Sequence, residues 1–422
     1  MTPAARVQAA IELLDTVIAS ARAKGAPADR IIADYFRARR YAGSKDRRAV
    51  RDLVYRAIRL CGPVPASGRA AMLAVAGMDA GLAALFDGSP HGPAPRGEGE
   101  EAANTGLAPK WLAAALRASG LGGREIAALL DRAPLDLRVN ALKADRAALE
   151  LPEAGEALAS AQGLRFPSGT PVEQWPAYEE GLVEIQDLGS QLIVEALPVS
   201  PGDTIIDLCA GGGGKTLALA ARLGNAASLV AADTDKRRLG NLAPRAARAG
   251  AAVDHTVLLD PGREMRSLHP WANKADHVLV DAPCSGSGTW RRSPEGRWRL
   301  DPPELARLNQ LQDHVLDIAA ELVRPGGTIA FVTCSVLDAE GPDRIAAFIE
   351  RHPGWRTEAL TLPLGARRQR RELAAGPQDH LDGGQPVHQD RPGHAAGRRH
   401  RRLPRVPRQR PARHGPHHRG LG

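Results

Sequence analysis

Two of the four cysteines in this chain follow apolar runs that are typical of buried strands. Cys284 comes directly after HVLVDAP, and Cys334 ends IAFVTC. Open parallel sheets bind ligands at the carboxyl ends of their strands, so we expect both thiols to lie at such an edge. A thiolate is a strong nucleophile and also a leaving group, so these residue types favour covalent catalysis. Cys209, at the end of another predicted strand, fits a small core residue better.

A glycine-rich turn provides a second candidate site. The stretch IIDLCAGGGGKT, residues 205–216, leads from a predicted strand into a predicted helix, so its backbone can approach a ligand closely. A P-loop would need glycine where Cys209 stands. A dinucleotide and S-adenosylmethionine both suit an acid at the end of the next predicted strand, where Asp233 could hold a ribose diol. Asp235 fits a helix N-cap better. The turn alone leaves these three ligands open.

The elements that would position these residues alternate along the second half of the chain. From Pro201 onward, apolar runs alternate with helical stretches, which predicts an α/β fold: a Rossmann-like domain with a parallel sheet covered on both faces. The N-terminal part shows helical periodicity instead. We expect a helical domain over 1–132 with a loop at 89–106, a small α+β subdomain over 133–198, the Rossmann-like domain over 199–366, and a tail over 367–422.

Three motifs, taken in order, resemble those of a known family. DLCAxxGGK, DAPCSGSG and TCS are similar to motifs of the RNA (cytosine-5)-methyltransferases of the NOL1/NOP2/Sun family. LRVNALK, VEIQDLGSQL and GTWRRSPEGRWRL resemble further segments of that family. GSKDRRAVRDLVYRAIR resembles the N-terminal NusB-like helical RNA-binding domain of its RsmB-like members, which act on 16S ribosomal RNA.

The resemblance implies an activity, a cofactor and site residues. It implies transfer of a methyl group from S-adenosylmethionine to carbon 5 of a cytidine in RNA, with ribosomal RNA favoured over transfer RNA. Cys334 would add to carbon 6 as the nucleophile, Cys284 would assist release, and Asp281 would hydrogen-bond the cytosine edge. The alternatives from other classes are a P-loop NTPase and an inactive RNA-binding assembly factor. The implied cofactor contacts are Cys209, Ala210, Gly211, Gly212, Gly213, Gly214, Lys215, Asp233, Asp260 and Asp281.

The net charge of +8 is carried by the tail, because residues 367–422 contain 14 arginines against four acids. The charge therefore does not by itself indicate a nucleic-acid surface on the folded part. A basic helix near the N-terminus and the segment after Pro-Cys could contact RNA phosphates, with a solvated face as the alternative. The predicted RNA-binding residues are Arg47, Arg48, Arg51, Arg291 and Arg292, with Arg297 as a further candidate.

Location and partners are expected from what the sequence lacks. There is no charged-then-apolar leader, no long apolar stretch, no CxxC pair and no Cys/His cluster at zinc spacing. We therefore expect a cytoplasmic protein that binds neither a membrane nor a metal ion. The resemblance implies RNA as the partner, and we expect a monomer.

Two features depart from the family pattern. The usual Ala-Pro of the first motif is Gly211-Gly212 here, which loosens the turn, although we expect binding to survive. After Leu364, where the family adds a final strand pair, the chain becomes rich in Arg, Pro, His and Gly. Such a composition cannot bury a core, so we expect a disordered tail. Our hypothesis is translation in a shifted frame from near codon 366; a basic RNA-binding arm is the alternative. If the expressed protein carries this shift, we expect an unpaired sheet edge.

Overall fold

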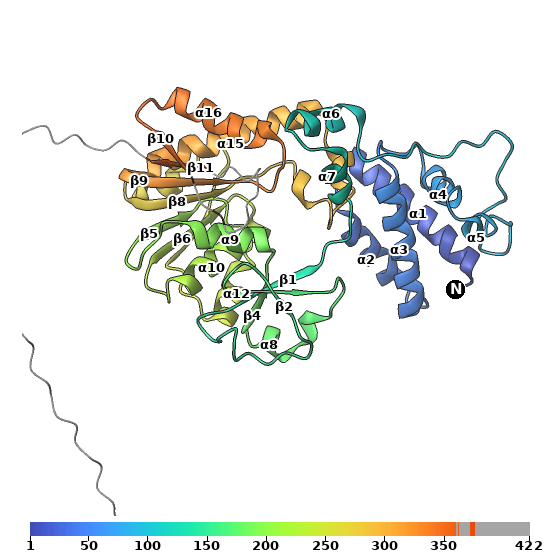
Figure 1. The fold of residues 1–422 in the computed structure, drawn as a ribbon, viewed down its shortest axis with the longest axis horizontal. Helices are drawn as coiled ribbons and strands as arrows, with labels where there is room; N and C mark the ends of the chain where they lie inside the picture. The colour runs from blue at the N-terminus through green and yellow to red at the C-terminus, as the bar shows by residue number, and fades with distance from the viewer. Residues whose placement is uncertain (360–361, 363–371, 376–422) are drawn as a thin grey trace, which may run out of the picture. The chain divides into compact units, whose positions relative to one another are not determined.

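The computed structural model describes residues 1–359, 362 and 372–375. Figure 1 shows a helical N-terminal part, a small sheet and a larger sheet with helices on its two faces. The α/β fold predicted from the sequence is thereby confirmed. Within the described ranges, no helix is both long and apolar enough to cross a membrane.

The N-terminal region is helical, as its periodicity predicted. Val7, Val54 and Met72 are fully buried in its shared core. Gly68 lets two helices approach closely, because a Cβ there would overlap the carbonyl oxygen of Ile11. The helices are α1 (Pro3–Arg22), α2 (Ala28–Ala38), α3 (Ser44–Leu60), α4 (Gly68–Ala76) and α5 (Ala80–Ala83). The predicted loop at 89–106 contains no helix or extended strand.

Two further helices, α6 (Lys110–Ala118) and α7 (Gly123–Ala128), pack elsewhere. Leu112 and Ile126 lie in one cluster with Trp290 and Leu308, which come from the C-terminal half of the chain. This part of the predicted 1–132 region therefore shares its core with the Rossmann-like domain. The domain limits given above stay predictions.

The small sheet is antiparallel, with the strand order β2-β3-β1-β4. Leu137 and Val183 are fully buried on it, and the rings of Phe166 and Trp175 pack edge to face with centroids 5.2 Å apart. Its elements are β1 (Leu135–Val139), β2 (Glu156–Ala157), β3 (Gly163–Phe166), the 3-10 turn η1 (Val172–Gln174), α8 (Pro176–Glu179) and β4 (Val183–Ile185).

The larger sheet has the order β10-β11-β9-β8-β5-β6-β7. Strands β9, β8, β5, β6 and β7 run parallel. The chain leaves β5 towards β6 and later returns to its other side with β8, so the carboxyl ends of β5 and β8 border a switch point where such sheets bind ligands. The strands are β5 (Thr204–Asp207), β6 (Ser228–Asp233), β7 (His255–Leu258), β8 (Ala275–Asp281), β9 (Val323–Val332), β10 (Arg356–Ala359) and β11 (Glu372–Ala375).

Helices cover both faces of this sheet, as predicted. Ile205 packs with Leu219 on one face, whereas its neighbour Ile206 packs with Leu316 on the other, because successive strand residues point to opposite sides. The elements between the strands are α9 (Leu188–Ala196), α10 (Gly214–Arg222), α11 (Lys236–Leu239), α12 (Leu242–Ala249), α13 (Met265–Leu268), η2 (His269–Trp271), η3 (Ser287–Thr289), α14 (Gly296–Arg299), α15 (Pro302–Leu322), η4 (Asp338–Glu340) and α16 (Pro342–Arg351).

The expected unpaired sheet edge was wrong. Leu373 in β11 pairs antiparallel with Ala330 of β9 on one side and with Glu358 of β10 on the other. Pairing needs only backbone N–H and C=O groups, so an open edge can recruit a strand whose composition does not favour one. The expectation of disorder therefore fails at residues 372–375. The rest of the predicted tail, 367–371 and 376–422, lies outside the described residues, and the frame-shift hypothesis stays untested.

Candidate active site

The carboxyl ends of β8 and β9 bring two thiols together. β8 ends at Asp281 and β9 at Val332, and the two strands pair in parallel up to these residues. The sulfur atoms of Cys284 and Cys334, each two or three residues further on, lie 3.3 Å apart. Cys334 is exposed and Cys284 is half-buried. The two cysteines predicted to share a sheet edge thus lie in direct contact.

The contact gives the two thiols unequal acidities. Hydrogen bonding to Cys334, followed by burial and the charge of Glu340, raises the pKa of Cys284 above its ordinary value. The same hydrogen bond lowers the pKa of Cys334, and the Lys215 ammonium adds to this against burial and the charge of Asp281. Either sulfur could be the donor in this contact, and the two pKa directions favour Cys284 as the donor and Cys334 as the acceptor. Since the thiolate is the reactive form, the lowered pKa favours Cys334 as the nucleophile.

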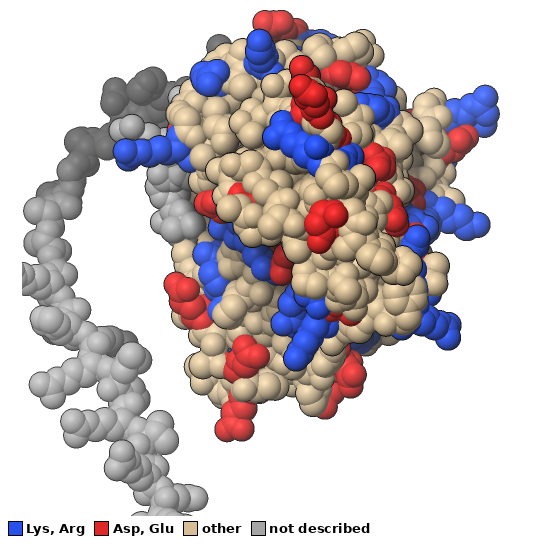
Figure 2. All heavy atoms as spheres, turned by 90° about the vertical axis from the view of Figure 1, so that its right-hand side faces the viewer, with Lys and Arg blue, Asp and Glu red and all other residues tan. Residues whose placement is uncertain are grey.

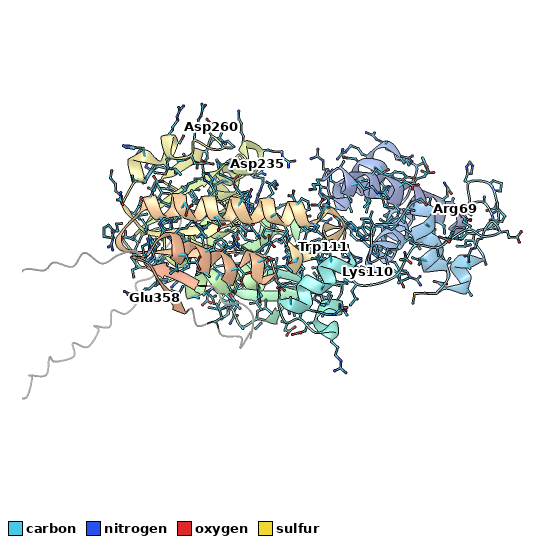
Figure 3. All side chains as sticks on the ribbon, turned by 90° about the horizontal axis from the view of Figure 1, so that it is seen from above. Arg69, Lys110, Trp111, Asp235, Asp260 and Glu358 are labelled. Atoms are coloured by element: carbon cyan, nitrogen blue, oxygen red, sulfur yellow. The ribbon has the colours of Figure 1, made fainter. Side chains whose placement is uncertain are left out.

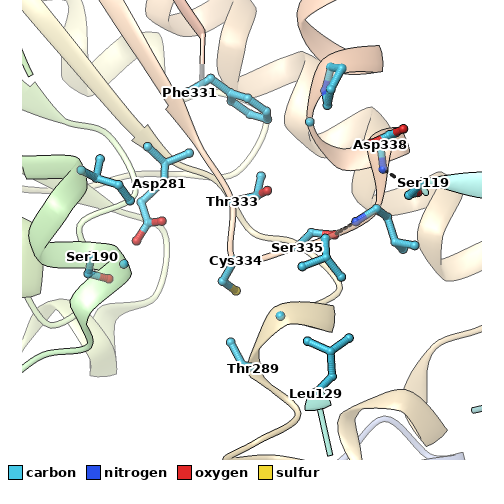
Figure 4. Close-up of a pocket in the computed structure, with 18 of the residues that line it drawn as sticks. Ser119, Leu129, Ser190, Asp281, Thr289, Phe331, Thr333, Cys334, Ser335 and Asp338 are labelled. Atoms are coloured by element: carbon cyan, nitrogen blue, oxygen red, sulfur yellow. Dashed lines mark hydrogen bonds between the residues drawn. The ribbon is translucent and has the colours of Figure 1, made fainter. Parts of the chain in front are cut away.

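Cys334 opens into a cavity of about 600 Å³. Figure 4 shows Cys334 beyond the end of β9 and Asp281 at the end of β8, with Thr333 and Ser335 flanking the thiol. Other lining residues come from several further helices and loops, so the cavity lies where the sheet meets its surrounding helices. They include Ser119, Leu129, Asp187, Ser190, Lys215, Thr289, Arg292 and Asp338.

An ion pair joins the glycine-rich turn to the end of β8. Lys215, in the first turn of α10, donates to Asp281 with an Nζ–Oδ2 distance of 2.5 Å. Both side chains line the cavity, and that of Lys215 is only 10% exposed. The pair therefore presents a carboxylate and an ammonium group beside the Cys334 sulfur.

A second ion pair on the cavity wall was missed in the sequence. Arg292 donates to Asp187 at 2.9 Å, and Asp187 also caps α9 by accepting from the Ser190 backbone N–H. Burial opposes ionisation of Asp187, but the hydrogen bond and charge of Arg292 prevail and lower its pKa. The motif VEIQDLGSQL contains this aspartate, but nothing in its spacing indicates a partner 105 residues away.

The glycine-rich turn between β5 and α10 is held by Asp233 and packed against neighbouring helices. Asp233 accepts from the backbone N–H groups of Gly211 and Asp235, each at 2.7 Å. Gly213 has φ +81°, and a Cβ there would overlap Leu242, so only glycine fits this close approach. Asp235 caps α11, which confirms the predicted N-cap.

Carboxylates surround this turn and indicate the charge of its ligand. Asp207, Asp233 and Asp281 act electrostatically on one another and on Cys209. The Oδ1 atom of Asp207 is buried without a hydrogen-bond partner among the described residues. The Asp233 and Asp281 carboxylates would repel the phosphates of a nucleotide, whereas they suit a sulfonium cation and a ribose diol. The residues present therefore fit S-adenosylmethionine better than the ligand of a P-loop.

Other predicted site residues lie apart from the cavity. Asp260 is exposed beyond β7 and does not line the cavity (Figure 3). Arg47, Arg48 and Arg51 are exposed on α3, where Arg47 donates to the carbonyl of Ala42. Figure 2 shows Lys and Arg side chains projecting from the helical side of the molecule, interspersed with Asp and Glu.

The further candidate Arg297 was wrong as a phosphate ligand. Its side chain is fully buried, and its guanidinium donates to the backbone carbonyls of Ile58, Arg59 and Cys61 at the end of α3. The last carbonyls of a helix have no partner within the helix, so a buried end needs donors of this kind. By contrast Arg291 is exposed and donates to the carbonyl of Arg132.

Known proteins match the part of the chain that carries the two thiols. Residues 194–383 match the model of the family described as 16S rRNA methyltransferase RsmB/F. The ribosomal RNA small subunit methyltransferase B of Enterobacter sp. (strain 638) is 36% identical over 195 residues, which cover 46% of this chain and 44% of that protein. The chain thus matches less than half the length of this curated relative.

Two solved structures share the fold. The crystal structure of PH0851 has a TM-score of 0.64 at 22% identity and covers 89% of this chain and 99% of its own. That of NSun6 from Pyrococcus horikoshii with SFG has a TM-score of 0.52 at 18% identity and covers 64% and 97%.

The sheet, its switch point and the cavity at its carboxyl edge define a Rossmann-like methyltransferase domain. Within that class, residues 194–383, which are less than half of the chain, match the RsmB/F family model. The resemblance noted in the three motifs is confirmed.

Proposed function

We propose that this protein methylates carbon 5 of a cytidine in RNA, through a covalent bond between Cys334 and carbon 6 of the base. The observation that carries the proposal is the contact between Cys334 and Cys284, 3.3 Å apart, with the pKa of one thiol lowered and that of the other raised. The names of the matched family and relative support ribosomal RNA of the small subunit as the substrate. Transfer RNA is the second candidate.

Carbon 5 of cytosine is a weak nucleophile, and addition of the Cys334 thiolate to the ring would activate it. As the sulfur bonds to carbon 6, the electrons of the C5–C6 double bond become available at carbon 5, which takes the methyl group. S-adenosylmethionine, when bound, supplies that methyl group in electrophilic form. Asp281 would accept a hydrogen bond from the exocyclic amino group of the base, and its ion pair with Lys215 would hold Asp281 in place.

Cys284 would complete the cycle. Once Cys334 is bonded to carbon, its charge no longer raises the pKa of Cys284, so Cys284 can ionise more readily. It then takes the proton from carbon 5, the double bond re-forms, and the bond between carbon 6 and the Cys334 sulfur breaks. The product is released and Cys334 leaves as a thiolate.

The remaining site residues follow from the same proposal. Residues 209–215 and Asp233 would hold the cofactor along the turn, with Asp233 at the ribose and Asp281 facing both ligands; Asp260 would contact the cofactor from beyond β7. RNA phosphates would contact Arg291 and Arg292 beside the cavity. A second RNA contact would be made on α3 by Arg47, Arg48 and Arg51. We also propose that the chain acts as a monomer.

Substitution of the thiols tests the proposal. Cys334→Ala is expected to abolish methyl transfer from labelled S-adenosylmethionine to ribosomal RNA, because the nucleophile is lost. Cys284→Ala is expected to accumulate a protein–RNA adduct that survives a denaturing gel. Cys61→Ala, a thiol buried in the N-terminal core, is the matched control and should retain transfer. Adducts with Cys334→Ala instead would reverse the two roles, and transfer by a Cys334→Ser protein would refute the mechanism.

The target can be identified in cells. Bisulfite sequencing of total RNA with and without the gene is expected to show one or more cytidines protected in small-subunit ribosomal RNA that lose protection in the deletion strain. Protection lost in transfer RNA alone would favour the second candidate.

A further inference from the structure

A buried carboxylate lies directly behind the two thiols. Glu340, at the end of η4, is fully buried, although it follows Cys334 by only six residues. Among the described residues, no Lys, Arg or His lies within ion-pair distance of its carboxylate, so no cation offsets its charge. A buried charge of this kind is costly unless hydrogen bonds satisfy it. Its contacts show which part of the molecule depends on it.

Glu340 is bonded to both flanks of Cys284. The backbone N–H of Ser285 donates to Oε1 at 2.8 Å, and the Ser285 hydroxyl donates to Oε2. The amide of Gln312, on α15, donates to Oε1 at 3.1 Å and also to the carbonyl of Pro283 at 2.9 Å. The residues immediately before and after Cys284 are therefore tied to one carboxylate, directly or through one amide.

The loop that carries Cys334 is tied to the same residue. The hydroxyl of Thr333, directly before Cys334, donates to the backbone carbonyl of Glu340 at 3.1 Å. The two loops are also joined to each other: the Ser287 and Ser335 hydroxyls lie 2.9 Å apart, and the Gly288 N–H donates to the Cys334 carbonyl at 2.9 Å. Glu340 thus stands at the junction of both thiol-bearing loops.

The charge of Glu340 acts unequally on the two sulfurs. It is one of the causes that raise the pKa of Cys284, after the hydrogen bond to Cys334, burial and the charge of Cys334. The charges that act most on Cys334 are Asp281 from β8 and Lys215 from α10, which oppose each other and are themselves paired. The second ion pair of the cavity, between Asp187 and Arg292, likewise has its charges matched. Among the described acids that bear on the two thiols, Glu340 therefore combines contact with both thiol-bearing loops and the absence of an ion-pair partner.

We propose that Glu340 is a positioning residue that holds the two loops in register and, through its negative charge, keeps the shared proton on Cys284, so that Cys334 carries the reactive thiolate. This inference deepens the proposed function, because it assigns the division of roles between the two thiols to a residue that touches neither substrate nor cofactor. It involves no bond change beyond the location of one proton.

Alkylation of the folded protein without RNA tests whether the charge of Glu340 affects the relative reactivity of the two thiols. Brief treatment with iodoacetamide near neutral pH, followed by mass-spectrometric mapping, is expected to label Cys334 well before Cys284. Glu340→Gln retains the size of the side chain but removes its charge; its amide NH2 group replaces one acceptor oxygen and can donate to the Ser285 hydroxyl. The share of label on Cys284 relative to Cys334 should then rise by about tenfold, as expected if the two pKa values move together by about one unit.

Two matched variants distinguish the effect of the Glu340 charge from that of its hydrogen bond to Ser285. Ser285→Ala removes the hydroxyl contact and leaves the charge, so Cys334 should still be labelled first. Glu350→Gln removes an exposed glutamate on α16 and should leave the labelling as in the wild type. An unchanged ratio in Glu340→Gln, or an equal change in Ser285→Ala, would overturn the charge role.

A third variant covers the case in which Glu340→Gln does not fold. Glu340→Asp retains the charge but withdraws it from Ser285, so Cys334 should still be labelled first; preferential labelling of Cys284 in this variant would refute the inference. The labelling experiment is independent of methyl transfer. If the ratio responds as described and the wild-type protein methylates no RNA, the proposed function fails while this inference stands. If instead the wild-type protein methylates RNA but the labelling ratio of the two cysteines does not change in the Glu340 variants, Glu340 does not determine which thiol is the nucleophile.

Discussion

Single side chains set the ionisation of the cofactor site. Asp207, at the end of β5, is fully enclosed, and burial raises its pKa to about 7 against the hydrogen bond donated by Thr216. The neighbouring charge of Asp281 acts in the same direction as burial. An aspartate in an unfolded chain ionises near pH 4. The folded protein therefore holds a proton here that the unfolded chain has already released.

This difference predicts a pH dependence of stability. The contribution of neutral Asp207 is fully present below about pH 4 and is lost as the pH rises to about 7, because the folded pKa lies above the unfolded one. Asp207→Asn cannot ionise, so its melting temperature relative to the wild type should rise between pH 4 and pH 7 and level off above. Thermal melts of both proteins across this range check the slope. Parallel curves would contradict it.

The chemistry-bearing residues could be predicted where they stand next to a recognisable element. Cys284, Cys334 and Lys215 each follow an apolar strand or a glycine turn, and such local signals are visible in a single sequence. Glu340 and Asp187 could not be found this way, because their role depends on partners that are close only in the fold. Arg297 was misread for the same reason: its segment is basic, but its carbonyl partners lie more than 230 residues earlier.

Among the elements, the glycine-rich turn carries the most specific requirement. Gly211 and Gly213 both have positive φ, whereas Gly212 does not. The Arg238 guanidinium packs over Gly211, where a Cβ would lie 2.5 Å from its nearest nitrogen. The loss of the Ala-Pro usual in the family therefore leaves a turn that is filled from outside by an arginine of α11.

Alanine should be tolerated less well at Gly213 than at Gly212 in this turn. Gly213→Ala forces a Cβ into Leu242 at a left-handed position and is expected to cost about 1–3 kcal/mol of folding stability and to weaken cofactor binding. Gly212→Ala is the matched control, because its Cβ would lie 3.2 Å from a terminal nitrogen of Arg245 at an ordinary φ. Calorimetric titration with S-adenosylmethionine and urea unfolding measure both effects. Equal losses in the two variants would argue against a special role of Gly213.

The elements were largely predictable because parallel strands buried on both faces are nearly continuous apolar runs. The apolar runs expected from Pro201 onward became strands such as β6, and the helical stretches between them became helices such as α15. β11 was not predictable, since ELAA has neither the length nor the alternation of a typical strand. Its place is decided by the open edge of β9, which is a property of the assembled sheet.

At the scale of the whole molecule, one segment connects the catalytic loop to the helical region. It begins after Cys284, buries Trp290 among the side chains of α6 and α7, and ends with Trp298 in the core formed by α1–α5. Between them, Glu295 accepts from the backbone N–H of Ala28 and Arg297 donates to the end of α3. The position of the helical region relative to Cys284 is therefore set by buried hydrogen bonds rather than by a free linker.

Removal of this connection should destabilise the molecule strongly. Arg297→Met leaves several buried carbonyls at the end of α3 without donors and is expected to cost about 2–4 kcal/mol in urea unfolding. Arg299→Met is the matched control, since Arg299 donates to the exposed carbonyls of Gly25 and Ala26, and it should cost less than about 1 kcal/mol. A similar cost in both would show that burial of Arg297 is not the deciding feature.

The contact between the two sulfurs also exposes the molecule to oxidants. A peroxide that takes two electrons from Cys284 and Cys334 would join them in a disulfide and be reduced to water, and the nucleophile and its partner would vanish in one event. The protein can therefore work only where its surroundings are reducing, and a thiol such as dithiothreitol should return whatever activity peroxide has removed.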